Sequence, residues 1–128
     1  MRTVRVIFRW LLGVFFIVAG ANHFVHPAMY VAIMPPYLPW HLPLVYLSGA
    51  CESILGALLL VQRTRRMAAW GLVALLIAIF PANIHMAMHP SLYPEIPAPA
   101  LWIRLPLQGL LIAWAWLYTR EASPGGPA

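Results

Sequence analysis

Four apolar runs fill most of this sequence, and each is close to the length that a helix needs to cross a lipid bilayer. The runs extend over about residues 6–24, 42–61, 67–86 and 101–118. A spanning helix needs roughly 20 predominantly apolar residues, so the runs predict four crossings. Charged side chains make up 9% of the 128 residues, whereas about a quarter is usual in soluble domains. We therefore expect an all-α, polytopic membrane four-helix bundle, folded as a single domain over residues 1–120.

All eight basic residues are arginines, and their positions predict the orientation of the bundle. Cytoplasmic loops of membrane proteins carry an excess of Lys and Arg. The charges lie mainly at the edges of the apolar runs, so they indicate topology rather than nucleic-acid binding. Arg104 alone lies toward one side, which we expect to be the outer side. This excess predicts that the other side, with both termini, is cytoplasmic. The seven arginines on that side are Arg2, Arg5, Arg9, Arg63, Arg65, Arg66 and Arg120.

Three further features bound the organisation of the chain. The stretch 19–21 (Ala-Gly-Ala) resembles a signal-peptidase site, but the first run is long and aromatic-rich, and three more apolar runs need a partner helix, so we interpret it as a spanning helix. Residues 121–128 are rich in Pro and Gly and predict a disordered tail. Cys51 is the only cysteine, which excludes a disulfide or dithiol chemistry within the chain.

The two segments on the predicted outer side are rich in proline. Residues 27–43 contain five prolines and residues 90–99 contain four. Proline lacks a backbone N–H and restricts the residue before it, so neither segment can be regular helix throughout. Both also carry Tyr and Trp side chains, which favour the membrane interface. We expect Pro-rich interfacial loops that form a lid over the outer end of the bundle.

Glu52 is the most constrained polar residue, because it lies near the middle of the second run. A charge at the bilayer centre costs at least a few kcal/mol, so we expect this carboxyl to be protonated or paired. Arg104 and Gln108 lie one helical turn apart in the fourth run and could both reach it. The other helices contribute polar groups at a similar depth. The predicted cluster, a ligand or proton site, is His23, Glu52, Asn83, Arg104 and Gln108.

The cluster has more than one interpretation. Interhelical hydrogen bonds stabilise bundles in lipid, so the residues could form a brace without further function. Ionisable residues inside membranes, however, commonly mark ligand sites or proton paths, and this cluster holds more polar groups than one brace needs. A metal or haem site is a third interpretation, because imidazole and thioether ligands suit copper and haem iron. Its candidates are His23, His26, His85 and His89, and we assign no metal to them.

Several of these residues lie in short motifs whose ordered set resembles the DoxX-like family of small bacterial four-helix membrane proteins. The resemblance covers nearly the whole chain. It rests on the stretches Gly20-Ala21-Asn22-His23-Phe24 leading to Pro27 and Tyr30, Met34-Pro35 with Leu38-Pro39, Leu47-Ser48-Gly49-Ala50-Cys51-Glu52, Phe80-Pro81-Ala82-Asn83-Ile84 and Trp102-Ile103-Arg104-Leu105-Pro106-Leu107-Gln108.

The resemblance implies a bacterial inner-membrane protein, the same five site residues, and several activities. Relatives are associated with a thiosulfate:quinone oxidoreductase subunit, with other membrane oxidoreductase complexes, and with helpers that mature membrane or secreted proteins. The sequence has no room for a separate catalytic domain, so an independent enzyme is not expected. We expect a quinone-like small molecule in an outward-facing polar pocket, serving a redox system. The alternatives are a non-catalytic assembly factor with a partner protein, and metal or haem handling. Oligomerisation stays open.

Overall fold

The computed structural model describes residues 2–120, and within this range all regular elements are helical. The elements in order are α1 (Arg2–Val25), α2 (Pro27–Ala32), α3 (His41–Leu60), α4 (Arg65–Met88), the 3-10 turn η1 (Pro90–Leu92) and α5 (Ala98–Tyr118). Helices α1, α3, α4 and α5 are long and apolar enough to cross a membrane. This confirms the predicted all-α fold with four spanning helices. The predicted disordered tail lies outside the described residues.

The helices extend beyond the apolar runs at several ends. Helix α1 begins at Arg2 and α4 at Arg65, because an arginine can continue a helix while its long side chain reaches the polar boundary of the bilayer. Helix α5 begins at Ala98, with Pro99 in its first turn, where a missing N–H costs nothing. Pro81 lies inside α4, which nevertheless continues to Met88, so this proline does not end the helix.

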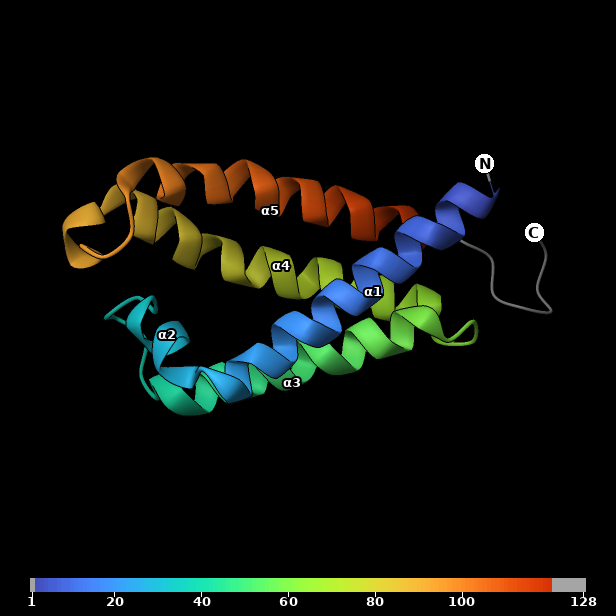
Figure 1. The fold of residues 1–128 in the computed structure, drawn as a ribbon, viewed down its shortest axis with the longest axis horizontal. Helices are drawn as coiled ribbons and strands as arrows, with labels where there is room; N and C mark the ends of the chain where they lie inside the picture. The colour runs from blue at the N-terminus through green and yellow to red at the C-terminus, as the bar shows by residue number, and fades with distance from the viewer. Residues whose placement is uncertain (1, 121–128) are drawn as a thin grey trace.

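The bundle is built from two helix pairs. Helix α1 packs along α3, and α4 packs along α5, while α3 and α4 make the main contact between the pairs. Figure 1 shows the pairs converging at one end and separating toward the other. The converging end holds the beginning of α1 and the end of α5, and we call it the arginine end. The end that carries α2 and η1 is the loop end.

Each end has its own apolar core. At the arginine end, the core joins all four long helices through Leu12, Phe16, Leu59, Leu72 and Tyr118, among others. The smaller core at the loop end is formed by Met86, Ala87, Tyr93 and Leu101. Many large apolar side chains elsewhere are exposed on the outside of the helices. Such a surface suits the hydrocarbon of a bilayer and not water.

Small residues bring α1 and α3 into close contact. A Cβ atom on Gly56 would lie 2.7 Å from the carbonyl oxygen of Gly13, and one on Gly49 would lie 2.8 Å from that of Gly20. The two glycines on each helix are seven residues apart, so both pairs lie on one seam. Glycine is required here because any side chain would separate the backbones. This seam fixes how α1 presents its polar residues to α3.

Candidate functional site

A cavity of about 510 Å³ lies between the two helix pairs on the side of the loop end. All four spanning helices contribute to its wall, which is mostly apolar. Residues after α2 also line it, among them Met34, Pro35 and Leu38. Part of the first Pro-rich segment thus lines the cavity, whereas residues 90–99 do not. All five predicted site residues line the cavity: His23, Glu52, Asn83, Arg104 and Gln108.

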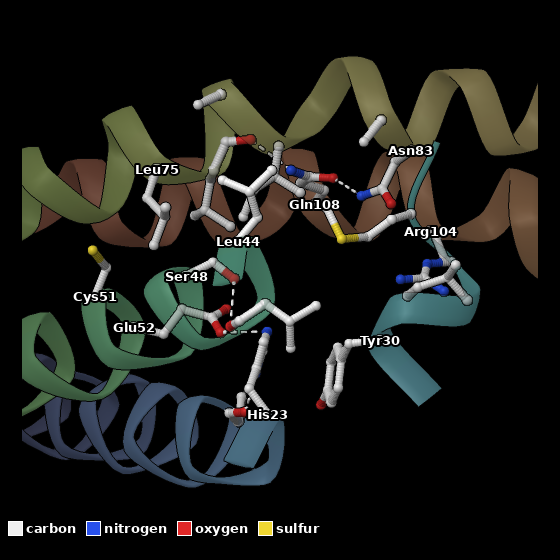
Figure 2. A pocket seen from close by; sticks show the side chains of 18 of the residues that line it. His23, Tyr30, Leu44, Ser48, Cys51, Glu52, Leu75, Asn83, Arg104 and Gln108 are labelled. Carbon is white, nitrogen blue, oxygen red and sulfur yellow. Dashed lines mark hydrogen bonds and ion pairs between the residues drawn. The ribbon is translucent and has the colours of Figure 1, made fainter. Parts of the chain in front are cut away.

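Figure 2 shows how these side chains enter the cavity from opposite walls. His23 and Glu52 come from the α1–α3 pair, together with Ser48 and Cys51 of α3. Cys51 lies about 100° around the helix from Glu52 and need not share its site, and yet it lines the same cavity. The cavity is wide enough to include both faces. Asn83, Arg104 and Gln108 come from the α4–α5 pair.

His23 and Glu52 form the central contact of the first wall. The Nε2 atom of His23 lies 3.2 Å from Oε2 of Glu52, and both side chains are nearly buried. The Nδ1 atom of His23 lies 2.7 Å from the carbonyl oxygen of Ala19. A carbonyl can only accept, so Nδ1 carries a proton and donates it. An unprotonated Nε2 facing an ionised carboxylate would place two acceptors together, so we assign one further proton to this pair, either on Nε2 or on the carboxyl group.

His23 and Glu52 lie within ion-pair distance of each other, but their atoms are not aligned for a hydrogen bond. Oε2 of Glu52 consequently has no hydrogen-bond partner among the described residues, although it is buried. Buried carboxyl oxygens are normally hydrogen-bonded, and exceptions occur where a functional site awaits a partner. The carboxyl oxygen is thus available to an additional donor in the cavity.

The glycine seam sets the position of His23. A Cβ atom added to Gly49 would lie 2.5 Å from Cβ of His23. The histidine therefore sits directly above a residue that has no side chain, one turn before Glu52. Ser53 strengthens the same seam, because its hydroxyl donates to the carbonyl oxygen of Ile17 at 2.9 Å. The close approach of α1 and α3 is what brings the imidazole to the carboxyl group.

Tyr30 of α2 forms an edge of the site and was not among the predicted site residues. Its ring stacks on His23, with centroids 3.8 Å apart and planes inclined by 16°. The amide of Asn22 donates to the Tyr30 hydroxyl at 2.7 Å. We expected Tyr30 to be an interfacial aromatic side chain in a loop. The available signal was Pro27, a favoured first residue of a helix, which turns this segment back over α1.

Asn83 and Gln108 form a separate hydrogen-bonded unit on the second wall. The Asn83 amide donates to the side-chain oxygen of Gln108, and the Gln108 amide donates to the carbonyl oxygen of Leu76 at 2.6 Å. Both helices of the α4–α5 pair are joined by this chain. The sequence suggested that Gln108 could reach Glu52, but in the structure Gln108 does not donate to it. The structure assigns Gln108 to bracing its own helix pair.

Arg104 does not form the predicted pair with Glu52. It is partly buried and lines the cavity, and Figure 2 shows its guanidinium group directed into the space near Tyr30. Within residues 2–120, Arg104 has neither a hydrogen bond nor an ion pair. The difference follows from the helix pairing, because Glu52 and Arg104 belong to different pairs that separate toward the loop end.

The metal interpretation gains little from the structure. His85 and His89 stack with ring centroids 4.3 Å apart, but His23 is engaged with Glu52 in the cavity. Within residues 2–120, no three His, Cys, Asp or Glu side chains lie close enough together to hold a metal ion. The four histidines named as candidates, including His26, are thus not assembled into one site in this structure.

Comparison with known proteins gives one match, to a family model described as "Domain of unknown function (DUF8561)", over residues 12–119. The chain belongs to this family. The matched region contains every residue of the cavity described above. No curated protein and no solved structure matches the chain. The description of the DUF8561 family names no activity.

Proposed function

We propose that this protein binds a quinone-like small molecule in the cavity between its helix pairs and serves a membrane redox system. The observation that carries the proposal is the composition of the cavity. Apolar walls enclose about 510 Å³, and polar groups converge on this space from both sides. Ligand sites for small molecules have this mixture of apolar surface and a few placed polar groups. The resemblance to the DoxX-like family adds support, because some of those relatives are associated with quinone chemistry.

The cavity is open toward the apolar surface of the protein. Phe15 of α1 and Leu107 of α5 both line it, and yet 49% and 52% of their surface is exposed. Leu47 of α3 also lines it and is 60% exposed. These side chains face lipid in a membrane-spanning chain. A lipid-soluble molecule such as a quinone can therefore reach the cavity from within the bilayer.

The polar groups have separate roles in this proposal. His23 and Glu52 hold one proton between them and exchange it with an oxygen of the bound molecule. Asn83 and Gln108 keep the opposite wall in place, and Arg104 faces the ligand from α5. The excess of arginines at the arginine end supports a cytoplasmic position for that end. The cavity of the proposed inner-membrane protein then lies in the outer half of the membrane.

Two measurements test the proposal. Mass spectrometry of protein purified in mild detergent should detect a co-purifying quinone, and calorimetry should show saturable binding of a quinone with a short isoprenoid tail. Ala82→Trp, which fills the cavity wall, should abolish this binding. Ala113→Trp is the matched control, because Ala113 is exposed on α5 and does not line the cavity.

Either of two results would overturn the proposal. One is equal binding to the Ala82→Trp and Ala113→Trp variants, which would mean that the probe partitions nonspecifically. The other is a stable co-purifying protein with no small molecule and no quinone binding. That second result would favour the assembly-factor alternative.

A further inference from the structure

The ionisable groups that line the cavity leave it with a net positive charge. Arg104 contributes one positive charge, because a guanidinium group stays protonated in proteins. His23 and Glu52 share one proton, so this pair is neutral overall in either arrangement of that proton. Glu52 is the only acidic residue among those that line the cavity. The described part of the cavity therefore carries a charge of about +1 in a mostly apolar enclosure.

An uncompensated charge in such surroundings is costly. A partly buried cation in a spanning helix normally pairs with an anion or with backbone carbonyls. Arg104 has no such partner within residues 2–120, and the hydrogen bonds of its neighbour Gln108 are already used by Leu76 and Asn83. The bound molecule is the remaining source of a compensating group.

Tyr30 lines the cavity on the same side as Arg104, with its hydroxyl group pointing away from the guanidinium group (Figure 2). Its hydroxyl oxygen accepts the hydrogen bond from Asn22. The planar guanidinium fork of Arg104, which faces the cavity, suits an oxygen anion.

We propose that the molecule bound in this cavity is an acidic amphiphile, with a singly charged oxygen anion held by Arg104 and an apolar body against the cavity walls. This inference rests on the proposed function and narrows its ligand class. A quinone that carries an ionised ring hydroxyl has the required chemistry, and so does a long-chain carboxylate. A neutral quinone lacks the compensating charge.

Three probes of matched alkyl length separate these cases. The first is a 2-hydroxy-3-alkyl-1,4-naphthoquinone, whose hydroxyl is ionised at neutral pH. The second is its neutral methyl ether, and the third is the corresponding alkyl carboxylate. Calorimetric titrations in one detergent should show that the hydroxyquinone binds at least about tenfold more tightly than its ether.

Variants assign the preference to one side chain. Arg104→Gln should bind the hydroxyquinone and the ether equally, and Arg104→Lys should recover part of the difference, because the charge returns without the planar fork. Arg63→Gln is the control for net charge, since Arg63 lies in the turn between α3 and α4 and does not line the cavity. Thermal unfolding of each variant checks that the fold is retained.

The outcomes separate this inference from the proposed function. Equal binding of hydroxyquinone and ether to the wild type, or a preference that survives Arg104→Gln, would overturn the inference while the quinone proposal stands. Binding of the carboxylate alone, dependent on Arg104, would support the anion and overturn the quinone proposal. Absence of binding by all three probes would overturn both.

Discussion

The Nε2 atom of His23 lies 3.2 Å from Oε2 of Glu52, while Nδ1 of the same ring is held 2.7 Å from the carbonyl oxygen of Ala19. The imidazole is therefore fixed at one nitrogen and shares a proton with the carboxyl group at the other. This arrangement distinguishes a proton-exchanging pair from a simple brace, because only the pair depends on a titratable group at position 52.

Glu52→Gln should preserve the fold and alter ligand binding. The glutamine amide can donate to Nε2 of neutral His23, so we expect the free energy of unfolding in detergent to change by less than about 1 kcal/mol. The dependence of quinone affinity on pH should weaken, because the carboxyl group no longer exchanges a proton. Thermal unfolding and calorimetry measure the two quantities. If affinity and its pH profile both stayed as in the wild type, Glu52 would be a brace only.

Gly49→Ala should displace His23 from Glu52. The added methyl would lie 2.5 Å from Cβ of His23 and 2.8 Å from the carbonyl oxygen of Gly20, so α1 and α3 must separate. Overpacking of this kind typically costs about 1–3 kcal/mol, and quinone binding should weaken with it. Gly109→Ala is the matched control, since nothing lies within 4 Å of its added Cβ. That variant should be as stable as the wild type or slightly more so. Equal stability of both variants would contradict the close seam.

Asn83 and Gln108 should behave as one unit in a double-mutant cycle. Asn83→Ala and Gln108→Ala each remove the hydrogen bond between them, so the double variant should lose less stability than the sum of the single losses. Interactions of this type between spanning helices average roughly 0.6 kcal/mol, with a maximum near 1.7. Thermal unfolding of the four proteins in one detergent gives the coupling. Additive losses would mean that the hydrogen bond contributes nothing to stability.

Much of the fold could be predicted from sequence because the bilayer imposes the length of each apolar run. The four runs are confirmed as helices, and the polar residues selected from them all line one cavity. The partner of Glu52 could not be predicted, since hydropathy does not show which helices pair. Arg104 was predicted as the partner of Glu52 because it is the only cation in the sequence at that depth. The glycines seven residues apart on both α1 and α3 were the available signal for α1–α3 pairing, and hence for His23 as the partner.

Tyr93 should make the loop end sensitive to alkaline pH. This side chain is buried with Met86 and Leu101. The nearest partners of its hydroxyl are distant, with the carbonyl oxygen of Met34 at 3.5 Å and Nδ1 of His85 at 3.4 Å. Such long contacts are weak, so Tyr93→Phe should change stability at neutral pH by less than about 1 kcal/mol.

The effect of Tyr93→Phe should instead grow above about pH 10. Burial raises the pKa of Tyr93 above its ordinary value of 10.0, and the nearby phenol of Tyr37 raises it further. The unfolded chain then ionises before the folded one. Stability that is present below about pH 10 is lost as the pH rises through the higher pKa of the folded state. Thermal unfolding in detergent at pH 8 and pH 11 should show a smaller alkaline loss for Tyr93→Phe than for the wild type. Tyr46→Phe, on the exposed side of α3, should retain the wild-type loss, and equal losses in all three proteins would contradict the burial of the Tyr93 hydroxyl.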